Sequence, residues 1–213
     1  MPIMEKIDFA LLCDGTSDRC LVPILKWLLR RYFADIPING IWADVSRSRL
    51  EQYTLVNRIR LAADLYEPDV LFIHRDAEAQ DQESRYEEIR DAVSRIRERL
   101  PRLICVVPVR MTESWLLFNE RAMKVAAGNP NCRTHIELPP LSTIESLPDP
   151  KQRLIDILII ASELRGRHLK RFKPLQCRHL ITENIEDFSP LFELEAFQRL
   201  SRDIEQLSMT AQR

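Results

Sequence analysis

Five acidic residues follow three apolar segments of this chain, in positions that suit the binding of a divalent cation. They are Asp14, Asp18, Asp76, Glu78 and Glu113. Carboxylate oxygens are the hard ligands that Mg²⁺ and Mn²⁺ prefer in proteins. Five carboxylates in one crevice would repel one another and destabilise the fold, unless a divalent cation neutralised them. If the fold brings these acids together, the sequence therefore predicts a Mg²⁺ or Mn²⁺ site.

Strand-like and helix-like patterns alternate four times before about residue 125, which indicates how these acids meet. The strand-like runs span residues 7–13, 36–43, 69–76 and 103–109, and the helical patterns span 21–32, 50–66, 86–100 and a segment that opens at Thr112. Such alternation is typical of an α/β fold, with a parallel sheet flanked by helices and right-handed crossovers. Ligands of such sheets bind outside the carboxyl ends of the strands. We therefore expect the acids to meet at this edge.

Each acid also has a purely structural explanation. Asp18 can favour a helix N-terminus, Asp76 can cap a loop, and Glu113 can be a first-turn acid. His74 lies in a buried run, where a packed or hydrogen-bonded core histidine is more common than a catalyst. The convergence of the acids on one edge is what favours the metal site.

The segment Asp14-Gly15-Thr16 first suggests and then excludes a phosphatase. These residues match the end of the Asp-x-Asp-Gly-Thr signature of haloacid-dehalogenase-type phosphatases, whose first aspartate attacks phosphorus. Leu12 occupies that position here, and a leucine cannot be a nucleophile. Because the chain has four glycines, spaced far apart, the phosphate loops G-x-x-x-x-G-K and G-x-G-x-x-G are excluded as well.

The chain is expected to divide into three parts. Residues 1–127 form the α/β domain, residues 128–150 form an irregular, proline-rich connection, and residues 151–213 form a helical C-terminal extension packed on the first domain. Within the extension, apolar spacing predicts helices over 154–164 and 188–207. A length of 213 residues suits one domain with such an elaboration.

One stretch carries a local charge that the net charge of −1 hides. Residues 164–182 contain no acid, and they contain the cations Arg165, Arg167, Lys170, Arg171, Lys173 and Arg178. Cations that neutralise phosphates release counterions, so this stretch is a candidate for binding a nucleic-acid backbone. The residues singled out for that role are Arg167, Lys170, Arg171 and Lys173. The alternatives are an acidic face of a partner protein and an ordinary solvated surface.

Cysteine usage and hydropathy bear on the compartment. The five cysteines, an odd number without disulfide-like spacing, and the lack of a signal peptide predict a cytoplasmic protein. No apolar stretch approaches the roughly 20 residues that cross a bilayer, so we expect no membrane association. Cys132, His135, Cys177 and His179 are zinc-type ligands. A structural zinc is therefore an alternative to their being ordinary loop and core residues.

Several motifs resemble a known family. An acid-glycine pair ends the first strand-like run and Asp76-x-Glu78 ends a later one, as in Toprim domains, the metal-binding modules of topoisomerases, primases and overcoming-lysogenization-defect nucleases. The segments DGTSD, IHRDAE, VPVRMTESWLL and EDFSPLFELEAFQRLSRDI are similar to those of a group of small bacterial Toprim-like proteins. This resemblance covers most of the chain in pieces, and it implies a Toprim/Rossmann-like sheet with a helical C-terminal elaboration.

The resemblance also implies roles for single residues. Asp14 takes the place of the family's glutamate, and Asp76 and Glu78 take the place of its Asp-x-Asp pair. Glu113 matches the acid that precedes tryptophan, and Arg75 would steady a phosphate. The implied reaction is metal-dependent cleavage of a nucleic-acid phosphodiester. The implied metal ligands are Asp14, Asp18, Asp76, Glu78 and Glu113, and the implied catalytic residues are Asp14, Glu113 and Arg75.

Members of that group often accompany an ABC- or SMC-type ATPase, sometimes in antiphage loci. The resemblance therefore implies a nuclease or nuclease-like effector in such a complex, in bacterial antiphage defence or DNA maintenance. Asp14 is one methylene shorter than the family's glutamate, and Glu78 is one methylene longer than the usual aspartate. These departures change the reach of both groups and favour an alternative, a noncatalytic interaction subunit that keeps the fold. Whether the chain forms a homo-oligomer is left open.

Overall fold

A four-stranded parallel sheet forms the centre of the α/β part of the chain, as the sequence predicts. The computed structural model describes residues 5–46, 53–78 and 81–211. The strands are β1 (Ile7–Leu12), β2 (Ile38–Trp42), β3 (Val70–His74) and β4 (Arg102–Val106). Their order across the sheet is β2-β1-β3-β4, and all neighbouring pairs are parallel.

The register of the two central strands decides which residues share the carboxyl edge. Leu12 in β1 pairs with Ile73 in β3, so both strands end at the same level. On the other side of β3, His74 pairs with Val106, the last residue of β4. Every residue of β3 is buried, which explains its continuous apolar sequence. The segments that follow these three strands therefore start side by side.

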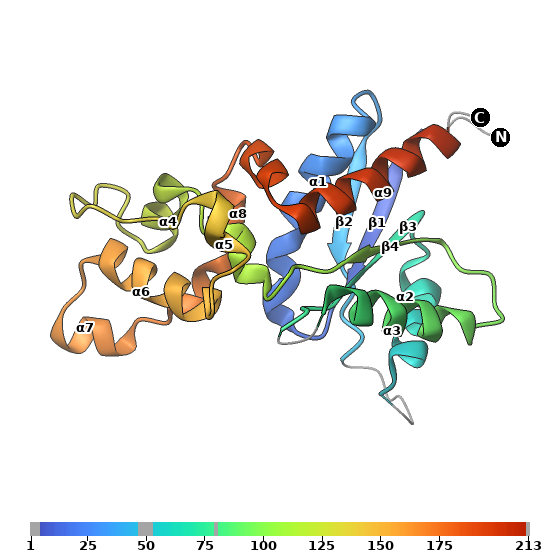
Figure 1. Ribbon diagram of the computed structural model, residues 1–213, viewed down its shortest axis with the longest axis horizontal. Helices are drawn as coiled ribbons and strands as arrows, with labels where there is room; N and C mark the ends of the chain where they lie inside the picture. Colours follow the sequence, from blue (N-terminus) through green and yellow to red (C-terminus); the bar gives the residue numbers. More distant parts are fainter. Residues whose placement is uncertain (1–4, 47–52, 79–80, 212–213) are drawn as a thin grey trace.

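Two pairs of helices cover the two faces of the sheet (Figure 1). Helices α1 (Leu21–Tyr32) and α9 (Glu195–Ala211) pack on the face that carries Phe9 and Phe72. Helices α2 (Leu55–Tyr66) and α3 (Gln82–Ser94) pack on the face that carries Leu12 and Ile73. Both faces are thus buried, as is typical of a parallel sheet.

Several helix boundaries differ from the predicted ones. Helix α2 begins at Leu55, where the Thr54 side chain accepts a hydrogen bond from the Asn57 backbone N–H at 3.3 Å; residues 50–52 of the predicted helix lie outside the described residues. The predicted helix behind Thr112 is instead a 3₁₀ helix, η2 (Thr112–Leu116). A separate helix, α4 (Glu120–Ala126), begins after it, because the Asn119 side chain caps a new N-terminus.

The C-terminal region is helical, with more and shorter elements than the apolar spacing predicts. The long connection contains one turn of helix, α5 (Leu141–Ile144). Two helices, α7 and α8, fall in the basic stretch, where no helix was expected. Residues 188–207 form a 3₁₀ helix and the start of α9 rather than one helix. The further elements are α6 (Pro150–Ser162), α7 (Gly166–Arg171), η3 (Pro174–Cys177), α8 (Arg178–Glu183) and η4 (Ser189–Glu193).

Helices α4, α6, α7 and α8 form a lobe beside the sheet (Figure 1). The same hydrophobic core extends through both parts and includes Met123 of α4, Leu158 of α6 and Ile181 of α8. The Trp115 ring meets the Phe197 ring edge-on at a centroid distance of 5.4 Å, which joins η2 to α9. Across the described ranges, no helix is long and apolar enough to pass through a bilayer.

Candidate functional site

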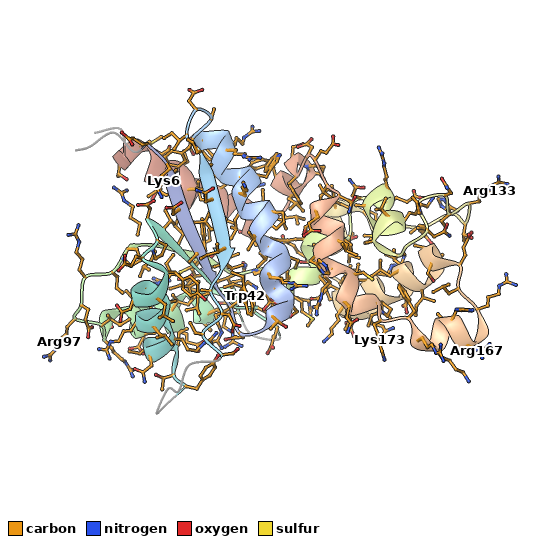
Figure 2. All side chains as sticks on the ribbon, turned by 180° about the vertical axis from the view of Figure 1, so that it is seen from behind. Lys6, Trp42, Arg97, Arg133, Arg167 and Lys173 are labelled. Atoms are coloured by element: carbon orange, nitrogen blue, oxygen red, sulfur yellow. The ribbon has the colours of Figure 1, made fainter. Side chains whose placement is uncertain are left out.

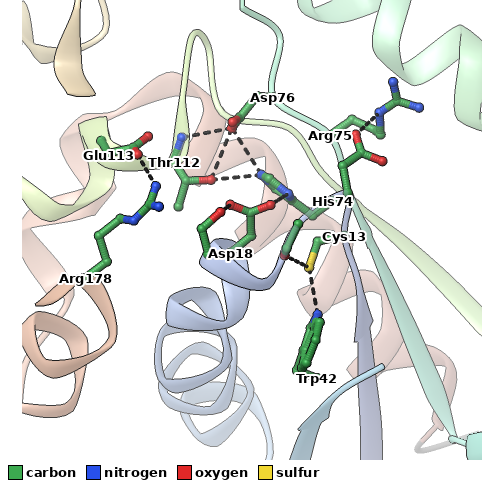
Figure 3. Close-up of polar contacts among 12 residues, drawn as sticks. Cys13, Asp18, Trp42, His74, Arg75, Asp76, Thr112, Glu113 and Arg178 are labelled. Atoms are coloured by element: carbon green, nitrogen blue, oxygen red, sulfur yellow. Dashed lines mark hydrogen bonds and ion pairs between the residues drawn. The ribbon is translucent and has the colours of Figure 1, made fainter. Parts of the chain in front are cut away.

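A buried histidine lies at the centre of the polar side chains at the carboxyl edge (Figure 3). His74 ends β3 and is 2% exposed. Its Nε2 lies 2.9 Å from Thr112 Oγ1 and 3.2 Å from Asp76 Oδ1. Its Nδ1 lies 3.6 Å from Asp18 Oδ2, which is an ion-pair distance but too long for a hydrogen bond. We call these four residues the His74 cluster.

The segments that follow the three strands position the members of this cluster. Asp18 lies in η1 (Thr16–Cys20), the 3₁₀ turn between β1 and α1. Asp76 lies two residues beyond β3, and its Oδ1 accepts a hydrogen bond of 2.8 Å from the Thr112 backbone N–H. Thr112 is the first residue of η2, whose preceding residue, Met111, provides no side-chain cap. Asp76 therefore caps η2 from a neighbouring loop and fixes Thr112 against His74.

The charges of the cluster stabilise one another. Burial lowers the pKa of His74, but its polar contacts with Asp18 and Asp76 and the negative charges of these two residues outweigh it and raise this pKa to about 9. Burial likewise opposes ionisation of Asp18, yet the contact with His74 leaves the pKa of Asp18 below its usual value. His74 is therefore an imidazolium at neutral pH, and it lies between the side chains of Asp18 and Asp76.

A second buried ion pair lies beside the cluster. Glu113 of η2 is 2% exposed, and its Oε1 accepts a hydrogen bond from Nη1 of Arg178, the first residue of α8. Burial raises the pKa of Glu113, whereas the charge of Arg178 lowers it. This pair connects the sheet edge to the C-terminal lobe, so the predicted catalytic acid is held by a side chain of the lobe.

Asp14 lies outside the cluster and between two arginines. Its Oδ1 lies 2.5 Å from Arg58 Nη1, and its Oδ2 lies 2.9 Å from Arg75 Nε. Arg58 is buried and also donates a hydrogen bond to the Cys13 carbonyl. Arg75 makes a further ion pair of 2.9 Å with Glu88. The predicted phosphate-binding arginine is thus already paired with two carboxylates.

Glu78 also lies apart from the other acids. Its backbone adopts a left-handed conformation with φ of 56°, and its N–H donates to the Arg110 carbonyl at 2.7 Å. Its side chain is 66% exposed and makes a long ion pair of 3.7 Å with Arg85. A hollow of about 380 Å³ next to it is lined by Glu78, Arg110, Met111, Pro148, Asp149 and Lys151.

The structure brings three of the five predicted metal ligands together and leaves two elsewhere. Asp18, Asp76 and Glu113 converge, but His74 lies between the two aspartates and Arg178 pairs with the glutamate. Among the residues that the structure describes, no group of three or more His, Cys, Asp or Glu side chains is arranged to hold a metal ion. The same holds for Cys132, His135, Cys177 and His179, which all lie in the described part of the chain. In this arrangement the side chains do not fit a bound cation.

Basic side chains of the chain itself neutralise the acids at the carboxyl edge, so repulsion between these carboxylates does not require a metal ion. Four arginines and a histidine neutralise the acids, and sequence reasoning missed this role for each of them. The pairs are His74 with Asp18 and Asp76, Arg178 with Glu113, Arg58 and Arg75 with Asp14, and Arg85 with Glu78. Thr112, which joins His74 to Asp76, was missed as well. A threonine at the start of an expected helix gave no signal for this role.

Thr112→Val is expected to lower the free energy of unfolding by about 2 kcal/mol, because the hydroxyl that bridges His74 and Asp76 would be lost from a buried site. Valine keeps the shape of threonine and leaves the backbone hydrogen bond to Asp76 intact. Urea unfolding followed by circular dichroism measures the effect. Thr112→Ser is the matched control, since it keeps the hydroxyl. Equal loss in both variants would mean that the methyl group, and not the hydrogen bond, matters.

The basic residues predicted to bind nucleic acid lie away from the acids. Arg167, Lys170 and Arg171 are exposed on α7, and Lys173 follows that helix. Figure 2 shows Arg167 and Lys173 at the opposite end of the molecule from Lys6 and Arg97. Within the described part of the chain, none of these four cations forms an ion pair. Their charge is therefore available to an external partner.

Comparison with known proteins adds no relative. No family model matches the chain, and neither the curated proteins nor the solved structures include a match.

Proposed function

We propose that this chain is a noncatalytic, Toprim-like subunit that binds nucleic acid and works with an ABC- or SMC-type ATPase in bacterial antiphage defence or DNA maintenance. The family and the partner class come from the four motifs quoted above. The observation that carries the noncatalytic assignment is that the acids of the carboxyl edge are paired with histidine or arginine of the chain itself. Acids that are paired within the chain are not free to hold a catalytic metal, and we therefore propose a binding role.

The energetics of the buried pairs support this choice. A cation that took Glu113 or Asp76 as a ligand would displace Arg178 or His74 from its carboxylate. The Arg178 side chain is 14% exposed and the His74 side chain 2%, so either displacement takes a carboxylate partner away from a largely buried cation. Such a loss costs several kcal/mol. The binding energy of the metal would have to exceed this cost before any ion remained bound.

The basic stretch supplies the proposed nucleic-acid surface. It is free of acids from residue 164 to 182. Arg167, Lys170 and Arg171 are exposed on a short helix without a buried residue, and Lys173 is exposed just after it. Backbone phosphates are the ligands that such an exposed, positively charged surface suits, because their recognition requires no deep pocket. Direct readout of base sequence is not part of this proposal.

Replacing Arg167, Lys170, Arg171 and Lys173 together by alanine is expected to weaken DNA binding strongly and to flatten its salt dependence. Removing four phosphate contacts should reduce the slope of log K against log salt by about 3. Fluorescence anisotropy with a labelled DNA strand, measured over a range of salt concentrations, gives this slope. The matched control removes four exposed arginines elsewhere, Arg30, Arg97, Arg99 and Arg202. Equal losses in both variants would show that binding follows total charge and not this surface.

A second candidate is the divalent-metal-dependent nuclease. It is favoured by the exposure of the Asp14 and Glu78 side chains, 50% and 66%, at the edge that a phosphodiester would approach. This function requires Asp14 to leave Arg58 and Arg75, and it requires Asp76 to leave His74. Nuclease activity thus requires these side chains to rearrange. A metal titration distinguishes the two candidates, because only the nuclease is expected to bind a metal ion.

A further inference from the structure

The structure contains a second polar site that the sequence does not indicate. A pocket of about 450 Å³ lies between η1 and the segment from η3 to α8. Its volume is in the range of about 300 to 1,000 Å³ that is usual for small-molecule sites. The lining residues are Thr16, Ser17, Arg19, Leu175, Gln176, Arg178 and His179. Two arginines and one histidine face this space, and no acid lines it.

We infer that this pocket binds a phosphate group of a small ligand or of a nucleic-acid chain. Arginine side chains are the usual partners of phosphate because their planar fork donates two hydrogen bonds to one anion. Arg19 of η1 and His179 of α8 both line the pocket, and Arg19 Nη2 lies within hydrogen-bond distance of His179 Nδ1, at 3.5 Å. The other N–H groups of the exposed Arg19 guanidinium can donate to an anion in the pocket.

Among the side chains that could donate hydrogen bonds to a phosphate in this pocket, Arg178 is held in place by contacts within the chain. Its Nε donates to the Leu175 carbonyl at 3.1 Å, and its Nη1 donates to Glu113. These two contacts hold the guanidinium in one position before any ligand arrives, so less side-chain freedom is lost on binding. The pair with Glu113 also connects this pocket directly to the acids of the carboxyl edge (Figure 3).

The remaining polar groups suit a phosphate as well. Ser17 donates its hydroxyl to Asp18 Oδ1 at 3.0 Å, so Thr16, which is exposed, is the hydroxyl that supplies a donor. Gln176 adds a side-chain amide at the rim. Of the acids nearby, Asp18 faces His74, Glu113 faces Arg178, and Glu183 lines an adjoining hollow together with Arg19 and His179. The pocket therefore combines several hydrogen-bond donors with a lining that contains no acid.

The pocket can be tested separately from the proposed nucleic-acid surface, because Arg167, Lys170, Arg171 and Lys173 do not line it. Isothermal titration calorimetry with inorganic phosphate tests it on the full chain. The wild type is expected to bind one phosphate per chain. Arg19→Ala/His179→Ala is expected to bind it at least about tenfold more weakly, because charge-assisted hydrogen bonds are lost. Arg30→Ala, which removes an exposed arginine outside the pocket, is the matched control and should bind as the wild type does.

Two further probes identify the source of the phosphate. Tighter binding of a 5′-phosphorylated tetrathymidylate than of its unphosphorylated form supports a terminal phosphate in the pocket, and equal binding that depends on Arg19 and His179 supports a backbone phosphodiester. Binding of inorganic phosphate alone supports a small free ligand. Absence of phosphate binding by the folded wild type, or unchanged affinity in the Arg19→Ala/His179→Ala variant, overturns the inference. The variant with Arg167, Lys170, Arg171 and Lys173 replaced by alanine is expected to bind phosphate as the wild type does, even where it loses DNA binding.

Discussion

Arg178→Ala is expected to lower the free energy of unfolding by about 3 kcal/mol, since it leaves a buried carboxylate without its partner. The Glu113 side chain is 2% exposed and the Arg178 side chain 14%, so solvent screens this pair weakly. Arg178 also ties α8 to η2, and the loss should therefore loosen the C-terminal lobe from the sheet edge. Urea unfolding of the wild type and the variant at neutral pH measures the difference.

A double variant separates the pair from general packing. Arg178→Met/Glu113→Leu replaces both charged groups by apolar side chains of similar length, so no charge stays buried without a partner. It is expected to recover most of the stability that Arg178→Ala loses, because buried ion pairs add little net stability over well-packed apolar residues. A double variant as unstable as Arg178→Ala would contradict this explanation and assign the loss to the packing of the arginine stem.

The stability of the wild type is expected to fall by about 3 kcal/mol between pH 6.5 and pH 9.5, because His74 binds its proton more tightly in the folded state. The folded pKa of about 9 lies above the ordinary value of 6.5. A raised pKa contributes stability that is complete below the unfolded pKa and is lost as the pH rises through the folded pKa. The contribution of His74 to the free energy of unfolding is thus lost between about pH 6.5 and pH 9.

His74→Gln provides the control for this pH dependence. Glutamine fills similar space and does not titrate, so the difference between wild type and variant reports the histidine alone. The comparison is needed because burial raises the pKa of Cys13 to about 12, and this thiol also lowers stability once unfolded cysteines ionise near pH 9. Urea unfolding at half-unit pH steps gives both curves. Parallel curves for the two proteins would contradict an ion-paired His74.

The sheet and its carboxyl edge could be predicted because they depend on local patterns. The apolar run of β3 and the helical spacing of α1 are properties of short segments, and parallel topology then places the residues after β1, β3 and β4 at one edge. The convergence of Asp18, Asp76 and Glu113 follows from this topology. The sequence therefore locates the edge and its acids without any knowledge of side-chain packing.

The partners of those acids could not be predicted, because they come from distant segments. Arg58 lies 44 residues from Asp14, and Arg178 lies 65 residues from Glu113. No periodicity connects such residues, since their contact depends on how helices pack. The short helices α7 and α8 could not be predicted from the sequence either, because of their length. With six residues each they hold too few positions to show a helical period.

The contacts that His74 and Arg178 make with the acids change how these acids are interpreted, because the sequence alone suggests that they are metal ligands. Five acids at one edge indicate a cation as long as their neutralising groups are unknown. Once His74 and Arg178 are placed, the same acids form ion pairs within the chain. Asp14 forms ion pairs within the chain as well, because Arg58 and Arg75 contact its two carboxylate oxygens.

A calorimetric titration with Mn²⁺ tests the central claim, that cations of the chain itself neutralise this acidic edge. The proteins are the wild type, Asp76→Ala/Glu78→Ala and a control that removes two exposed acids elsewhere, Asp35→Ala/Glu205→Ala, each with its fold checked by circular dichroism. The account predicts no stoichiometric Mn²⁺ binding by any of the three. Binding of one or two ions by the wild type and the control, absent in Asp76→Ala/Glu78→Ala, would contradict it and establish the metal site of the nuclease candidate.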